Sequence, residues 1–112
     1  MVAHIVLFKV RPSLDAAARQ RLASGFEDAL RGIPSIRRAR VGHRVTLGRA
    51  YEQLMTVDYE YAAILEFDDV AGLEEYLAHP AHDVLGARFF ESFDVALMYD
   101  YELHEGAADW LL

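Results

Sequence analysis

The residues best suited to chemistry lie together in one short segment, residues 76–82, which reads YLAHPAH. A phenol from Tyr76 and two imidazoles from His79 and His82 lie on either side of Pro80. An imidazole changes its charge near neutral pH, so it can act as a general base when it is held in its neutral form. We therefore expect chemistry to be concentrated in this segment.

Pro80 determines how these side chains are positioned. Proline lacks a backbone N–H and disfavours helical geometry in the residue before it, so a helix carrying Tyr76 should end near His79 and another should begin at Pro80. His82 would lie in the first turn of the new helix, where the positive end of the helix dipole disfavours a charged imidazole. The alternative is that both histidines satisfy backbone groups at the junction while Tyr76 packs in the core.

The composition is that of one globular domain, residues 1–112, with apolar surface to spare. A chain of 112 residues is long enough for one hydrophobic core and too short for two domains. Hydrophobic residues make up 54% of the chain and charged residues 26%. This balance favours a pocket or a subunit interface in addition to the core.

The charge of the chain limits its partners. A net charge of -7 argues against nucleic acid and anionic membranes, which bind through clustered basic residues. One local group of arginines is an exception to the acidic balance: Arg37, Arg38, Arg40 and Arg44. We expect these residues to form the solvated face of an edge strand rather than a phosphate site.

Three features favour a cytoplasmic protein. There is no cysteine, so there is neither a disulfide nor thiolate chemistry, which is compatible with a reducing compartment. The first residues lack the basic start of a signal peptide. No apolar run approaches the length of a membrane span, so we expect no membrane partner.

Hydrophobic periodicity predicts four strands, at residues 2–10, 36–47, 59–67 and 93–103. The first helix should follow Ser13, which can serve as its N-cap, and should end at Gly32 and Pro34. Gly25 lies inside this helix at a cost of about 1 kcal/mol relative to alanine, which indicates close approach by a neighbouring element.

The third and fourth strands are separated by a second helical region. Asp68 or Asp69 should cap it, and Pro80 should divide it in two. The order β-α-β-β-α-β predicts a ferredoxin-like α+β fold, in which helices cover one face of an antiparallel four-stranded sheet. Because strand 2–10 is apolar on both faces, a second subunit packed on the open face is the economical cover.

The connection between the second and third strands is unusually apolar. Residues 48–58 include Tyr51, Leu54 and Met55, which favours a lid or an interface arm. An ordinary extension of the hairpin is the alternative that the sequence leaves open.

Several short segments occur in an order and spacing that together are specific. They are HIVLFK at 4–9, GIP at 32–34, VG at 41–42, YAAILEF at 61–67, YLAHPAH at 76–82 and DY at 100–101. In these segments the chain resembles the stress-responsive A/B barrel (Dabb) domain family. The resemblance covers residues 2–103 and leaves a short C-terminal tail.

The resemblance implies a homodimer, in which two sheets pair into a dimeric α/β barrel and each sheet and its helices enclose a cavity. A plant polyketide cyclase of similar sequence uses a histidine and a tyrosine for an aldol-type ring closure. By motif position these residues are His82 and Tyr76, and His4 matches a further histidine near that pocket. Phe26, from the apolar stripe of the first helix, and His79 are further candidates for substrate binding.

In such chemistry His82 would remove a proton next to a carbonyl group, and the Tyr76 hydroxyl would donate a hydrogen bond to the developing enolate oxygen. The implied ligand is a small apolar or carbonyl-containing compound, and no cofactor is expected. A metal site at His79 and His82 is disfavoured, because the pair straddles the proline break and only Asp83 adds a nearby carboxylate.

Several function classes remain open. The first is a cofactor-independent cyclase, isomerase or decarboxylase acting on a small carbonyl or polyketide-like compound. The second is a non-catalytic ligand-binding or stress-response dimer, and a cofactor-free monooxygenase is suggested by analogy of fold alone. Convergence of Tyr76 and His82 on one cavity would favour an enzyme. Residues 48–58 and the tail, residues 104–112, could line or close that cavity.

Overall fold

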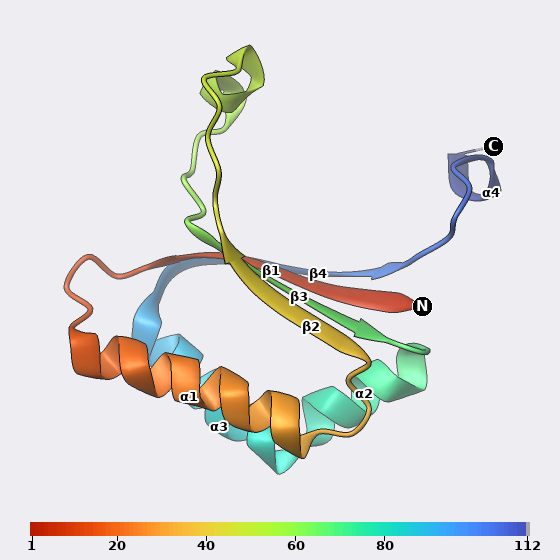
Figure 1. Ribbon diagram of the computed structural model, residues 1–112, viewed down its shortest axis with the longest axis horizontal. Coiled ribbons are helices and arrows are strands. Elements are labelled where there is room, and N and C mark those ends of the chain that lie inside the picture. Colours follow the sequence, from red (N-terminus) through yellow and green to blue (C-terminus); the bar gives the residue numbers. More distant parts are fainter. Residues whose placement is uncertain (112) are drawn as a thin grey trace.

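The computed structural model describes residues 1–111. Its four strands form one antiparallel sheet in the order β2-β3-β1-β4. The strands are β1 (Val2–Val10), β2 (Arg38–His43), β3 (Tyr61–Phe67) and β4 (Phe93–Glu102). Helices α1 (Ala16–Gly32), α2 (Val70–Ala78) and α3 (Pro80–Ser92) lie on one face of the sheet (Figure 1). The predicted ferredoxin-like α+β fold is therefore confirmed.

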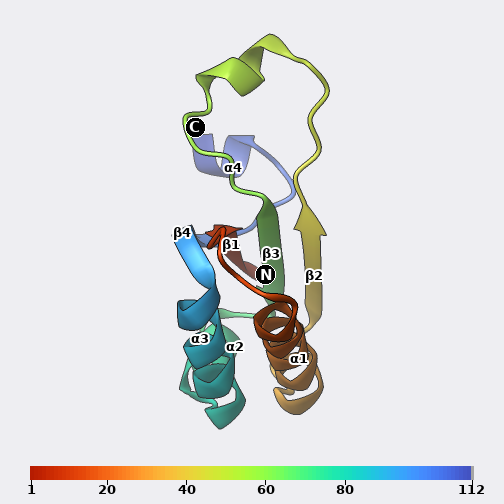
Figure 2. The ribbon, with the colours of Figure 1, turned by 90° about the vertical axis from the view of Figure 1, so that its left-hand side faces the viewer.

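The core lies between the sheet and the helices, which form two layers (Figure 2). β1 runs between β3 and β4, and its alternate residues Val6, Phe8 and Val10 are buried against the helical layer. Phe67 and Leu65 from β3 are among the most deeply buried side chains. The opposite face of the sheet is not covered by helices (Figure 1), and we call it the open face.

The start of α1 differs from the prediction. Ser13 is not the N-cap; Asp15 is, and its Oδ1 accepts a hydrogen bond from the Ala18 N–H at 2.8 Å. The chain first makes a turn in which the Leu14 N–H donates to the Arg11 carbonyl, so the helix begins later than expected. Aspartate and serine are comparable N-caps, and the sequence pattern alone could not separate them.

The sequence predicted that an element approaches Gly25 of α1 closely but could not say which one; the structure shows that it is α3. A Cβ at this position would lie 3.2 Å from Arg88 Cδ and 3.5 Å from Leu85 Cδ1, both on α3. The missing side chain therefore allows α1 and α3 to lie close together, as the prediction of close approach required.

The helix break at Pro80 is confirmed. Asp69 caps α2, since its Oδ1 accepts from the Gly72 N–H at 2.8 Å, and α2 ends at Ala78. His79 then caps α3, whose first residue is Pro80. The His79 Nδ1 accepts a hydrogen bond from the Ala81 N–H at 3.0 Å.

β2 is an edge strand, as predicted, but it ends at His43 rather than extending to residue 47. Residues 44–60, which we call the arm, project from the sheet on the side opposite to the helices (Figure 1). The arm contains the short 3-10 helix η1 (Ala50–Leu54). Its base continues the hairpin, because the Arg44 N–H donates to the Glu60 carbonyl.

The C-terminal tail carries α4 (Ala108–Leu111), and Leu112, the last residue of the predicted tail, lies outside the described residues. Within the described part of the chain, none of the helices has the length and apolar character that crossing a membrane would require.

Candidate functional site

A cavity of about 130 Å³ lies between the sheet and the helical layer. It is lined by His4, Val6, Phe26, Ala63, Leu65, Tyr76, His82, Leu85, Gly86, Phe89, Phe90 and Met98. The predicted site residues His4, Phe26, Tyr76 and His82 therefore meet in one cavity. They come from β1, α1, α2 and α3, so the fold joins groups that are distant in sequence.

The phenol and the imidazole at the centre of the prediction are in contact. The ring centroids of Tyr76 and His82 lie 4.7 Å apart, with an angle of 66° between the ring planes. The break at Pro80 makes this contact, because it directs α3 so that a side chain from its first turn meets one from α2. Tyr76 has a second aromatic neighbour, His4 on β1, whose ring centroid lies 5.8 Å from that of Tyr76.

His82 is held towards its neutral form. Burial lowers the pKa of the His82 imidazole below its ordinary value, and the positive charge that His4 can carry adds to this effect. The Asp83 carboxylate and the Leu77 backbone act in the opposite direction on this pKa, without reversing it. The Nδ1 of the ring is fully enclosed and has no partner at hydrogen-bond geometry among the described residues. The predicted neutral state is supported, with burial as its first cause.

Tyr76 is held in its protonated form. Its side chain is buried, and burial raises the pKa of the phenol to about 12. Within residues 1–111 the hydroxyl has no hydrogen-bond partner. A neutral phenol that lines a cavity without a partner is available to donate a hydrogen bond to a ligand there.

Asp100 is a site residue that the sequence reasoning missed. It lies opposite His4 in the register of β1 and β4, and its Oδ1 is 2.6 Å from the His4 Nδ1. The carboxylate favours the tautomer that carries a proton on Nδ1, which fixes the orientation of the ring. Of the carboxylates in β4, Asp100 is the one that lies directly opposite His4 in the strand register, and this pairing is the signal that could have found it.

His79 does not line the cavity, in contrast to the prediction that it binds substrate. Its Nδ1 is occupied by the backbone of α3, because the residue before a helix-initiating proline is in the position of an N-cap. His79 therefore has the structural role that the alternative interpretation gave to both histidines.

The mouth of the cavity lies between α3 and the edge strand β4. Phe90 and Met98 line the cavity yet are 65% and 49% exposed, so both reach solvent. Gly86, one turn before Phe90, leaves open space, since a Cβ there would meet nothing within 4 Å. Neither residues 48–58 nor any described residue of the tail lines the cavity in one copy of the chain.

A larger hollow of about 790 Å³ lies on the other side of the sheet, under the arm. Its floor includes Leu7, Ile64 and Leu97 on the open face, and its wall includes Leu54 and Met55 of the arm. It lacks the contact between a buried imidazole and a phenol that marks the smaller cavity. We therefore place the candidate active site in the smaller cavity.

The fold and the site together define a ferredoxin-like domain with a small cavity under its sheet, in which an imidazole and a phenol are in contact. The sequence matches the family model of the stress responsive A/B barrel domain (Dabb) over residues 2–103. The chain therefore belongs to this family, as the resemblance implied. None of the curated proteins matches the sequence.

Solved structures with the same fold include proteins of different kinds. A protein from Arabidopsis thaliana has 21% sequence identity and a TM-score of 0.78, with 96% of this chain and 99% of that chain covered. A hydroxynitrile lyase from Passiflora edulis has 17% identity and a TM-score of 0.78, with 94% of each chain covered. A dimeric protein of unknown function from Bacteroides fragilis has 27% identity and a TM-score of 0.65, with 91% of this chain and 95% of that chain covered.

Proposed function

We propose that this protein is a cofactor-independent enzyme that removes a proton next to the carbonyl group of a small compound. His82 is the base, and Tyr76 is the hydrogen-bond donor to the enolate oxygen. The observation that carries the proposal is the contact of the two rings at 4.7 Å in one cavity. An imidazole kept neutral and a phenol kept protonated are the states that these two roles require.

The proposed reaction begins when a carbonyl compound places its oxygen against the Tyr76 hydroxyl. The C–H electron pair becomes the enolate as the proton passes to the His82 imidazole. The enolate then either takes the proton back at another carbon, which is an isomerisation, or attacks a second carbonyl in the same molecule, which is a cyclisation. In the cyclisation, the alkoxide that forms takes the proton from the His82 imidazolium and so restores the base. The His4 ring, held by Asp100, adds a polar group at the far side of Tyr76.

The size of the cavity limits the substrate. A cavity of about 150 Å³ is known to hold one benzene molecule, so the volume of about 130 Å³ fits a reacting group of this size. A longer polyketide-like chain would have to extend through the mouth at Phe90 and Met98. We therefore propose a small carbonyl compound rather than a long chain held entirely inside.

A second candidate function is non-catalytic binding of a small apolar ligand. Among the described residues, His4, Tyr76 and His82 are the only titratable side chains that line the cavity, and the remaining lining is apolar. If the protein only binds a ligand, its affinity should depend on these apolar walls and should be retained when His82, the proposed base, is removed.

We also propose that the protein is a cytoplasmic homodimer. Structural neighbours from Bacteroides fragilis, Thermobifida fusca and Jannaschia are described as dimeric proteins with a ferredoxin-like fold. In this chain Tyr99 and Tyr101, which lie on the open face, are 54% and 51% exposed. Two-fold pairing of the open faces would remove this apolar surface from water.

The test is proton exchange in heavy water, followed by NMR on a panel of small ketones, aldehydes and 1,3-dicarbonyl compounds. Hydroxynitriles belong in the panel, since one structural neighbour is a hydroxynitrile lyase. The wild-type protein should exchange the proton next to a carbonyl, and His82→Ala and Tyr76→Phe should lose most of this rate. His43→Ala is the matched control, because His43 lies outside the cavity at the end of β2. Binding without exchange in the wild type would favour the ligand-binding function.

A further inference from the structure

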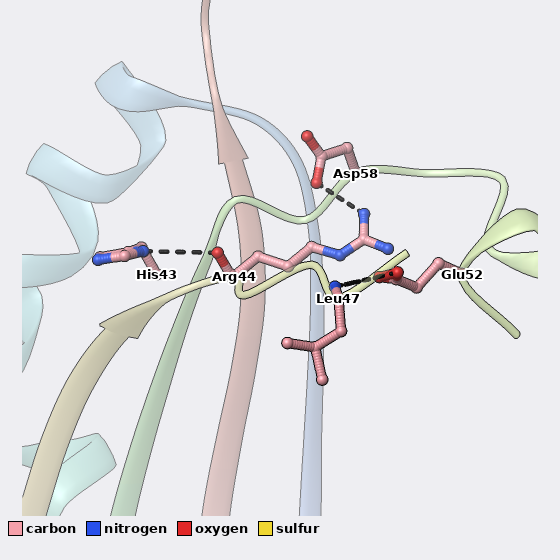
Figure 3. Close-up of polar contacts among 5 residues, drawn as sticks. All are labelled: His43, Arg44, Leu47, Glu52 and Asp58. Carbon is pink, nitrogen blue, oxygen red and sulfur yellow. Dashed lines mark hydrogen bonds and ion pairs between the residues drawn. The ribbon is translucent and has the colours of Figure 1, made fainter. Parts of the chain in front are cut away.

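The arm is ordered by its own polar contacts. The Glu52 carboxylate accepts a hydrogen bond from the Leu47 N–H at 2.9 Å, and Arg44 pairs with Asp58 at 2.7 Å (Figure 3). The Glu52 carboxylate also accepts from the Arg49 N–H at 2.8 Å. Gly48, with φ at 75°, supplies a left-handed turn that favours glycine. These contacts fix the shape of the arm without help from the helical layer.

The apolar side chains of this ordered arm have nothing to pack against in one copy of the chain. Their exposed fractions are 71% for Val45, 70% for Leu47, 59% for Tyr51, 74% for Leu54 and 55% for Met55. An arm that holds such side chains in water is typical of a segment that is completed by a partner.

The arm and the C-terminal tail rise from opposite ends of the sheet on the same side (Figure 1). The open face lies between them and forms the floor of the hollow under the arm. Leu7, Ile64 and Leu97 belong both to that floor and to the open face. The hollow is therefore continuous with the surface that the proposed homodimer covers, and one occupant can fill both.

We propose that the arm is a clasp for a second copy of this chain, closing over the partner so that Leu54 and Met55 are buried between the two protomers. The proposal rests on the homodimer proposed above. A two-fold axis gives each dimer two clasps, because each copy presents the same arm and the same open face. A small ligand is a poorer occupant, because a hollow of about 790 Å³, lined in large part by apolar side chains, is too wide to enclose it.

Thiol protection tests the clasp directly, because the chain has no cysteine of its own. Leu54→Cys places a single thiol on the arm, and Val70→Cys is the matched control at the start of α2, where Val70 is 54% exposed in the helical layer. In the dimer, a maleimide should modify the thiol of Leu54→Cys several-fold more slowly than that of Val70→Cys. When the protein is diluted until it is monomeric, the rate at Leu54→Cys should rise several-fold, while the rate at Val70→Cys should stay unchanged.

The dissociation constant gives an independent measurement. By analytical ultracentrifugation, Leu54→Ser should weaken the dimer by about tenfold or more, because each of two symmetry-related leucines loses its burial. Val70→Ser should leave the dissociation constant unchanged, and circular dichroism should show that both variants are folded.

The outcomes separate the two proposals. A wild-type protein that stays monomeric at every concentration overturns the homodimer and the clasp together. A wild-type dimer in which the two thiols react at equal rates, and in which Leu54→Ser dissociates like the wild type, overturns the clasp alone.

Discussion

Burial sets the chemical state of both members of the pair in the cavity. It lowers the pKa of the His82 imidazole and raises the pKa of the Tyr76 phenol to about 12. Burial disfavours the charged form of each group, so a neutral imidazole and a neutral phenol face one another near pH 7. One residue is thereby suited to accept a proton and the other to donate a hydrogen bond.

The lowered pKa of His82 predicts how stability depends on pH. The unfolded chain takes up the proton at the ordinary imidazole value of 6.5, and the folded chain only at a lower pH. The contribution of His82 to the free energy of unfolding is thus complete above pH 6.5. It is lost as the pH falls from 6.5 through the lower pKa that His82 has in the folded chain. Urea titrations should show the wild type losing stability relative to His82→Gln over this range. A wild type that gains relative stability in acid would contradict the assignment.

Tyr76→Phe separates the two roles of the phenol. The Tyr76 side chain is buried, but its hydroxyl has no hydrogen-bond partner among the described residues, so removal of the hydroxyl should change the free energy of unfolding by less than about 1 kcal/mol. The exchange rate should fall by about a hundredfold or more, as when one donor to an oxyanion is removed. Denaturation together with the exchange assay measures both quantities. A large loss of stability would reveal a structural hydrogen bond in place of a catalytic one.

At the scale of the elements, two helical glycines have different surroundings. Gly86→Ala should raise the free energy of unfolding by up to about 1 kcal/mol, because alanine favours the helix and its Cβ meets open space. Gly25→Ala should stabilise the protein less, or destabilise it, because its Cβ would lie 3.2 Å from Cδ of Arg88. The Arg88 side chain is also held in place by the hydrogen bond that its guanidinium donates to the Arg21 carbonyl. Urea denaturation of both variants tests the difference, and equal gains would contradict the close packing of α1 on α3.

The arm should lose its order in acid. Hydrogen bonds from the backbone, first from Leu47, lower the pKa of Glu52 below its ordinary value of 4.5, and the Arg44 charge adds to them while burial opposes them. Local order is thus complete above 4.5 and is lost as the pH falls through the lower, folded pKa. In that range the protection factors of the Leu47 and Arg49 amides, which compare the measured with the intrinsic exchange rate at each pH, should fall, and Glu52→Gln should lower them at neutral pH as well. Exchange that is insensitive to Glu52 would contradict its role.

The elements show why sequence reasoning succeeded where it did. The bounds of β1 and the break at Pro80 are local consequences of apolar periodicity and of the proline ring, so both were predicted correctly. The choice between Ser13 and Asp15 depends on a turn that a pattern of residue types does not specify. Asp100 and the mouth residue Phe90 depend on strand register and on the distance between α3 and β4, which are properties of the packed structure.

On the scale of the whole molecule, the sheet separates two surfaces with different roles. The acid–base cavity lies on the helical side, and the open face, the arm and the tail lie on the other (Figure 1). The apolar surplus of the sequence predicted a pocket or a subunit interface. The sequence could not show on which side of the sheet residues 48–58 lie, because the direction in which the arm leaves the sheet is set by the end of β2.

The central claim is that the neutral imidazole of His82 removes the proton. The most direct measurement compares the pH dependence of substrate proton exchange with the NMR titration of the His82 ring in the same protein. We predict that the exchange rate falls to half at the pH where this imidazole is half protonated, below 6.5, and that His82→Ala abolishes the exchange. A rate that ignores the titration of His82, or that survives in His82→Ala, would contradict the account.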